Sequence, residues 1–227
     1  MIKKLNLAGT WDFAMDPEKK GIDEHIYSKE FSDNIPLPGT ISMAQKGTPS
    51  DVKETGFLTD PYLFEGYAWY AKEIDLDQTD LDKNIILYLE RTRMTKVWVD
   101  DQLVGDFDSL NTPHEYDLTP YLKQTHFRLT ILVSNVDYPT KGGHLTSPDT
   151  QTNWNGIIGE IALHIFDQCY IKNVKTFPDT KTRTVRVTFD TVNTTKEEHE
   201  LTLQTQAFLT DISGDTGISS AAATQEV

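Results

Sequence analysis

A polar loop in the second half of the sequence carries the residues best suited to chemistry. The segment HLTSPDTQTNWNG runs from His144 to Gly156. Five of its residues carry groups that could bind a ligand: Asp149 has a carboxylate, Thr150 a hydroxyl, Gln151 and Asn153 have amides, and Trp154 has an indole ring. Such polar groups hold adjacent sugar hydroxyls, and a flat ring covers the apolar face of a sugar. We therefore predict that these five residues bind a carbohydrate; the alternative is a loop that only packs on another domain.

Two arginines in the segment LERTRMT form a second candidate. Arg91 and Arg93 come at the end of an apolar strand pattern. A guanidinium at that position can hold a substrate carboxylate through two parallel hydrogen bonds. An internal salt bridge with Glu90 or with a loop acid is the simpler explanation, and it is the one that we favour.

The sequence predicts no catalytic residue, metal site or cofactor in this chain. His114 and His144 lie in predicted loops without partners at metal-ligand spacing, so we expect each to be a surface or packing histidine. Cys169 is the only cysteine, which excludes an intramolecular disulfide and a cysteine-based zinc cluster. The sequence also lacks a nucleophile elbow, a His-Glu-x-x-His motif and a phosphate-binding loop.

Composition limits the partners further. The 227 residues include 21 Lys and Arg against 35 Asp and Glu, a formal charge of −14. Such a surface repels nucleic acid and anionic lipid, but it accepts a neutral ligand such as a sugar. No window has the length and apolarity of a membrane span or of a signal peptide. We expect a soluble chain, and a cytoplasmic and a periplasmic location both remain open.

The elements expected to position the loop are short β-strands. Phe127, Leu129, Ile131 and Val133 alternate with polar neighbours, and AWYAKEIDL, NIILYLE, KVWVDDQLVG and EIALHIF follow the same pattern. Many short strands without alternating helices favour an antiparallel sandwich or jelly roll. Two long loops, over residues 15–64 and 135–155, interrupt the strands. If they meet at one end of the sandwich, they make a natural binding rim.

The chain divides into two predicted domains. Residues 1–168 form the jelly roll, in which we expect the large aromatic residues of the strands to pack in the core: Trp11, Trp69, Tyr70 and Trp98. Residues 169–227 contain two more alternating strands, which suit the opening of an immunoglobulin-like sandwich. An immunoglobulin-like domain needs about 100 residues, so we expect this second domain to be partial.

A succession of short motifs also resembles a known family. GTWDF, LPGT, GYAWYAKEIDL, KVWVDDQLVG, PHEYDLTPYL, RLTILVSN and TNWNGIIGEIAL follow one another in this order. The succession is similar to the N-terminal sugar-binding domain of glycoside hydrolase family 2, which includes β-galactosidases, β-glucuronidases and β-mannosidases. The resemblance covers about residues 5–167, and the segment after it resembles the start of the family's immunoglobulin-like second domain.

The resemblance implies a role for the polar loop. In the family, the matching loop reaches the active site of a separate catalytic barrel, and it contacts the terminal sugar through an Asp that precedes an Asn-aromatic pair. Alignment on Asn153-Trp154 places that Asp at Thr150, one residue after Asp149. Either a one-residue shift lets Asp149 serve, or Thr150 and Gln151 contact the sugar instead.

Three interpretations remain open at this stage. The first is the non-catalytic N-terminal part of a family 2 glycosidase that acts on a β-linked sugar such as a galactoside. Its two catalytic Glu residues would lie on a barrel that this chain lacks, so we expect the chain alone to be inactive. The others are a free-standing carbohydrate-binding module and a structural or interaction sandwich without a sugar site. The sequence leaves open whether the protein forms homo-oligomers.

Overall fold

The computed structural model describes residues 3–51, 55–56, 59–140, 153–200, 202–210 and 216–226, and beyond residue 206 only the backbone. Every strand pair found there is antiparallel, and the described helices are three short 3-10 turns: η1 (Ile26–Ser28), η2 (Gln78–Asp80) and η3 (Thr119–Tyr121). The predicted all-β antiparallel fold is therefore confirmed. The chain separates into two compact units, Met1–Gln168 and Cys169–Val227. No described helix has the length and apolarity that a membrane span requires.

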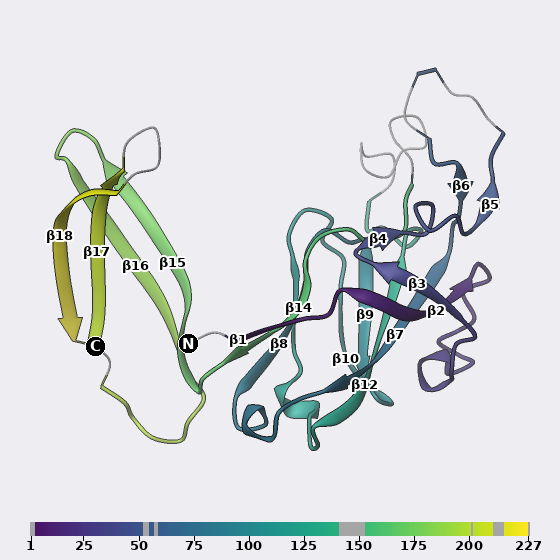
Figure 1. The fold of residues 1–227 in the computed structure, drawn as a ribbon, viewed down its shortest axis with the longest axis horizontal. Helices are drawn as coiled ribbons and strands as arrows, with labels where there is room; N and C mark the ends of the chain where they lie inside the picture. Colours follow the sequence, from purple (N-terminus) through teal and green to yellow (C-terminus); the bar gives the residue numbers. More distant parts are fainter. Residues whose placement is uncertain are drawn as a thin grey trace. The chain divides into compact units, whose positions relative to one another are not determined.

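The first unit contains two main sheets (Figure 1). The smaller sheet has the order β1 (Lys3–Asn6), β14 (Ile161–Phe166), β8 (Asn84–Leu89) and β11 (His114–Asp117). The larger sheet has the order β10 (Gln102–Phe107), β9 (Met94–Val99), β12 (His126–Ser134), β7 (Tyr67–Asp75), β2 (Gly9–Asp16) and β3 (Asp33–Leu37). Two small ladders pair β13 (Gly156–Ile157) with β4 (Gly39–Thr40) and β5 (Thr48–Pro49) with β6 (Tyr62–Leu63).

The core follows from the alternation along the strands. In β12, Phe127, Leu129, Ile131 and Val133 are at most 2% exposed and belong to the main apolar cluster. Leu87 of β8 is fully buried in the same cluster. Successive side chains of a strand point to opposite faces, so each sheet places one apolar row in the shared core. The four large aromatic residues that we predicted to be in cores are all at most 4% exposed, which confirms that prediction.

The outer face of the larger sheet is covered as well. Trp69, Trp98 and Leu132 form a second apolar cluster, against which Ile22, Ile26, Tyr27 and Phe31 pack. The rings of Tyr27 and Trp98 are stacked, with their centroids 5.1 Å apart. The first part of the predicted 15–64 loop therefore lies on this face and is held there by its own aromatic side chains. The sequence pattern did not predict this cover.

Local turn chemistry also matches the sequence. The turn at Asp100-Asp101 joins β9 to β10, and Asp100 has a φ of 51°, the left-handed conformation that short polar residues tolerate. The Asp100 carboxylate accepts a hydrogen bond from the backbone N–H of Arg128, at 2.9 Å. This contact links the turn to the neighbouring strand β12.

The second unit consists of two hairpins in the described residues. β15 (Cys169–Asp179) pairs with β16 (Thr184–Asn193), and β17 (Thr202–Thr210) pairs with β18 (Thr216–Glu226). The boundary after Gln168 is a feature of the structure. Whether this unit is an immunoglobulin-like domain stays a prediction.

Candidate functional site

The predicted sugar loop lies partly within the described structure. Asn153 and Trp154 are described, and they immediately precede Asn155 and strand β13. Asp149, Thr150 and Gln151 lie outside the described residues, as does His144. The structure therefore defines the segment by which this loop returns to the sandwich.

Asn135, at the end of β12, joins the two long loops. Its side-chain amide donates to the carbonyl oxygens of Phe64 and Asn153, both at 2.8 Å, and its Oδ1 accepts from the backbone N–H of Gly66 at 3.0 Å. Asn135 is fully buried, and a buried amide whose hydrogen bonds are satisfied fixes the groups around it. The returning ends of the 15–64 and 135–155 loops therefore meet at one end of the sandwich, which the sequence had left open.

Asn153 is used for anchoring. Its side-chain amide donates to the carbonyl of Asn135 at 2.8 Å, and its Oδ1 accepts from the hydroxyl of Tyr138 at 2.9 Å. Burial raises the pKa of Tyr138 to about 12, so this hydroxyl stays protonated and can donate. In this arrangement Asn153 binds the protein itself, and a role in ligand contact stays a prediction.

Asn155 ties the same segment to the core. Its amide donates to the carbonyl of Val133 at 2.9 Å, and its Oδ1 accepts from the hydroxyl of Tyr70 at 3.2 Å. The backbone N–H of Ile41 donates to the Asn155 carbonyl at 3.0 Å. Burial raises the pKa of Tyr70 far above its usual value, which keeps the donor neutral.

Gly156 makes the close approach of the two loops possible. Its φ is +151°, and a Cβ there would lie 2.2 Å from the carbonyl oxygen of Gly39. A side chain therefore cannot fit without moving backbone, which explains a glycine directly after the Asn-Trp-Asn sequence. The hydroxyl of Thr92 donates to the Gly156 carbonyl at 3.0 Å and fixes the same point from the strand side.

Arg93 supports the ring of Trp154. Its guanidinium lies 4.2 Å from the centroid of that ring, and its Nε donates to the Trp154 carbonyl at 3.1 Å. Arg93 is only 2% exposed, and burial lowers its pKa from the usual value. A guanidinium on an indole face combines cation–π attraction with packing, so Arg93 fixes the position of Trp154.

The two predicted arginines thus have different roles. Arg91 is exposed, and its Nε lies 3.8 Å from Oε1 of Glu90, which is the internal salt bridge that we favoured. Arg93 packs under Trp154 and is shielded from solvent.

Asp60 is a candidate that the sequence analysis did not identify. It is partly buried in the returning part of the 15–64 loop. Burial raises the pKa of its carboxyl, while a hydrogen bond with Ser42 and the positive charge of Arg93 act in the opposite direction. A partly buried carboxylate within electrostatic range of a guanidinium is a suitable acceptor for sugar hydroxyls. The Asp60-Pro61 pair in a proline-rich loop was the only signal in the sequence.

His114 was expected to be a surface or packing histidine, and no metal site was expected in this chain. The His114 ring is fully buried; its Nδ1 is 2.6 Å from the hydroxyl of Thr95 and its Nε2 is 2.7 Å from the carbonyl of Ser109. His114 is therefore a packing histidine, one of the two roles that we expected for it. Within the part of the chain that the structure describes, no three His, Cys, Asp or Glu side chains are grouped so that they could hold a metal ion.

Comparisons with known proteins place this architecture in a family. A family model described as "Glycosyl hydrolases family 2, sugar binding domain" matches residues 2–166. A β-galactosidase of Thermoanaerobacter pseudethanolicus is 29% identical over 124 residues, which are 52% of this chain and 16% of the relative. A β-glucuronidase of Paenibacillus borealis is 26% identical over 133 residues, which are 58% of this chain and 21% of the relative.

Solved structures show the same fold. A β-glucuronidase of an uncultured Clostridium species aligns with a TM-score of 0.66 at 20% identity, covering 100% of this chain and 39% of that one. A β-glucuronidase described as belonging to glycoside hydrolase family 2 aligns with a TM-score of 0.73 at 18% identity, covering 100% of this chain and 25% of that one.

The family model identifies the antiparallel sandwich of the first unit as a sugar-binding domain of the glycosidase type. This chain belongs to glycosyl hydrolase family 2, and residues 2–166 are its sugar-binding domain. The part of the chain that matches four curated relatives covers only 16% to 23% of their length.

Proposed function

We propose that this chain is the non-catalytic N-terminal part of a β-glycosidase of the β-galactosidase type, which hydrolyses O-glycosyl bonds. The family match carries this proposal. The chain supplies one wall of the substrate pocket through the loop that returns at Asn153, and a catalytic barrel of the same protein supplies the two carboxylates that retaining hydrolysis requires. Residues 169–227 are the beginning of an immunoglobulin-like domain between them.

The anchoring of the loop supports a role in substrate contact for this chain, with catalysis left to the barrel. Asn135, Asn153 and Asn155 fix the loop base with hydrogen bonds between 2.8 and 3.2 Å, and Gly156 allows the closest backbone contact. A loop whose base is fixed can present Asp149, Thr150 and Gln151 to a ligand with little loss of conformational entropy. Trp154, supported by Arg93, supplies the flat apolar surface.

The substrate at this wall is a neutral β-linked sugar. Arg93 is buried under Trp154, so its guanidinium is not presented to a substrate carboxylate. Arg91 is exposed and has Oε1 of Glu90 3.8 Å from its Nε, a carboxylate that competes with that of a substrate. Asp60 adds a negative charge, which suits hydroxyl groups better than a uronate. A β-galactoside meets these conditions better than a β-glucuronide.

Activity assays test the proposal directly. The 227-residue chain is compared with the same chain extended along its native gene, on chromogenic β-galactoside, β-glucuronide and β-mannoside. We expect no turnover by the chain and turnover of the β-galactoside by the extended protein. Turnover by the purified chain alone would show that catalytic residues lie within these 227 residues, and the proposal would be wrong. An extended reading frame without a barrel would favour a free-standing carbohydrate-binding module.

Asp60→Asn in the extended protein tests the added candidate. Loss of a charge-assisted hydrogen bond to a sugar hydroxyl is worth about 1.5–3 kcal/mol, so kcat/KM is expected to fall roughly 10- to 150-fold. Asp75→Asn is the matched control, because Asp75 is an exposed carboxylate on β7. Equal kinetics for the two variants would remove Asp60 from the site.

A further inference from the structure

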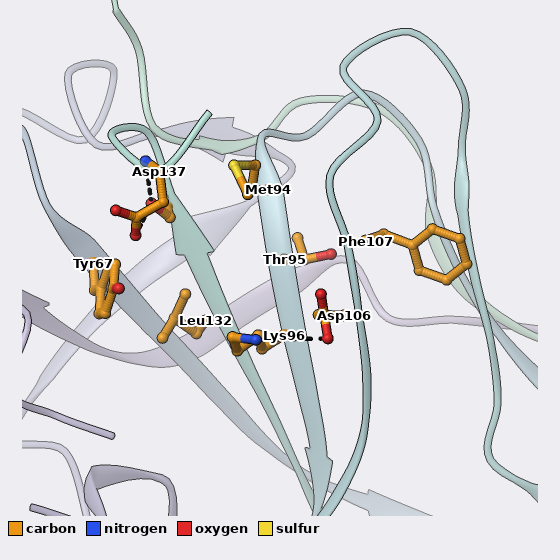
Figure 2. Close-up of a pocket in the computed structure, with 9 residues that line it drawn as sticks. Tyr67, Met94, Thr95, Lys96, Asp106, Phe107, Leu132 and Asp137 are labelled. Atoms are coloured by element: carbon orange, nitrogen blue, oxygen red, sulfur yellow. Dashed lines mark hydrogen bonds and ion pairs between the residues drawn. The ribbon is translucent and has the colours of Figure 1, made fainter. Parts of the chain in front are cut away.

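A second pocket opens on the outer face of the six-stranded sheet, apart from the loop described above. It has a volume of about 60 Å³, and most of its lining residues come from β7, β9, β10 and β12, with Asp137 following β12. Leu132 and Met94 make its floor, and Tyr67, Lys96, Asp106 and Asp137 stand around it (Figure 2). All of these residues belong to the first unit.

The floor of the pocket is apolar and firmly held. Leu132 is 2% exposed and belongs to the outer-face cluster with Trp69 and Trp98. The aromatic cover from residues 17–32 packs on the same cluster, with Tyr27 stacked on Trp98. The floor is therefore preformed, which lowers the entropy cost of binding a ligand there.

The sides of the pocket carry groups of both charges. On one side, Nζ of Lys96 lies 3.6 Å from Oδ1 of Asp106. On the other, Asp137 accepts a hydrogen bond from the Ser134 hydroxyl at 3.1 Å and lies 3.6 Å from Nζ of Lys19. Figure 2 shows the Lys96–Asp106 pair and the Asp137 group on opposite sides of Leu132, while the ring of Phe107 points away. Because each carboxylate has its own cation, the pocket favours an uncharged polar ligand.

Tyr67 adds a neutral hydroxyl to this set. Burial, and then a hydrogen bond with Asp137, raise the pKa of Tyr67 to about 12. Its hydroxyl therefore stays protonated at physiological pH. An apolar floor bordered by a phenol, an ammonium and two carboxylates is the combination that binds a sugar ring, whose C–H face is apolar and whose edge carries hydroxyls.

We propose that this outer-face pocket is an accessory binding site for a neutral sugar residue. A volume of about 60 Å³ exceeds what a single water molecule needs, so it accommodates one edge of a monosaccharide, such as a hydroxymethyl group, with the rest of the ring over the open mouth. So small a contact binds weakly, with a Kd in the millimolar range. Only the class of ligand rests on the proposed function; the lining residues named here are all described residues of the first unit.

The site is tested on the 227-residue chain by NMR. The ¹⁵N-labelled protein is titrated to tens of millimolar with methyl β-galactoside, methyl β-glucoside and glucuronate as probes. We expect saturable shifts of the amides of Tyr67, Lys96 and Leu132 with a neutral glycoside, and weaker shifts with glucuronate. No saturable shift at these amides, or preferential binding of glucuronate, would overturn the proposal.

Two variants assign any binding to the pocket. Tyr67→Phe keeps the ring and removes the hydroxyl, and it should weaken binding about threefold to tenfold. The double variant Lys96→Ala/Asp106→Ala should abolish detectable shifts. Lys175→Ala/Asp190→Ala is the matched control, because it removes an exposed pair at 3.5 Å in the second unit. Unchanged affinity in both pocket variants would place the binding elsewhere, and an unchanged melting temperature excludes misfolding as the cause of a loss. The proposed enzyme activity can fail without affecting this result.

Discussion

Strands β12 and β15 are of similar length, but they differ in how they are buried. β12 has β7 and β9 as partners, and residues 129–134 are all buried. β15 pairs with β16 alone in the described residues, and Val174 and Phe177 are 56% and 44% exposed. The comparison shows that an alternating sequence supplies an apolar face, but burial requires a second layer to cover it.

The largest expected effect comes from truncating an apolar side chain in each unit. Leu87→Ala in the core of the first unit should lower the free energy of unfolding by about 2–5 kcal/mol, because it leaves a cavity. Val174→Ala in β15 should change it by less than about 0.5 kcal/mol. Urea unfolding followed by circular dichroism reports on both units, and tryptophan fluorescence reports on the first, which contains every tryptophan. Equal losses for the two variants would show that the second unit is as well packed as the first.

Much of the fold could be predicted from local sequence, whereas much of the site could not. The alternation in β12 and the aromatic residues at 11, 69, 70 and 98 indicate strands and core because both signals are periodic or compositional. Asp60 comes within electrostatic range of Arg93 only through the strand order and the return of two long loops. A charged residue in a loop carries no periodic signal, so its neighbours cannot be read from the sequence around it.

Amide hydrogen exchange gives a finer version of the comparison. The amides of β12 lie between two partner strands, whereas β15 and β16 form a two-stranded sheet in the described residues. Local opening of β15 and β16 should therefore be easier, with exchange at least about tenfold faster than in β12. Exchange is measured by mass spectrometry on peptides from the intact chain. Equal protection of the two regions would contradict the account of unequal burial.

The smallest expected effect is a dependence of the first unit's stability on pH. Burial lowers the pKa of His114, and the hydrogen bond to the Ser109 carbonyl offsets this only in part. The unfolded chain then binds this proton more tightly than the folded one. The contribution of His114 is therefore complete above about pH 6.5, and it is lost as the pH falls through the folded-state pKa. Urea midpoints across this range should show a smaller slope for His114→Gln than for the wild type.

His126 provides the opposite case for the same experiment. A hydrogen bond to Asp75 raises the pKa of this exposed histidine, so its contribution is present at low pH and is lost as the pH rises. His126→Gln should therefore steepen the loss of stability at low pH, or leave it unchanged. A smaller slope in His126→Gln than in His114→Gln would refute the assignment of the acid sensitivity to His114.

The central claim, that the loop returning at Asn153 contacts the sugar, is tested by kcat/KM of single alanine variants. Asp149→Ala, Thr150→Ala and Gln151→Ala are compared in the extended, barrel-containing protein on its β-glycoside substrate. We predict that kcat/KM falls in at least one variant while Tm changes little. If the lost contact is the Asp149 carboxylate, the fall in kcat/KM should be roughly 10- to 150-fold. A loss only at Thr150 would support the alignment without a shift. Unchanged kcat/KM in all three variants would contradict the claim and leave the loop with a purely structural role.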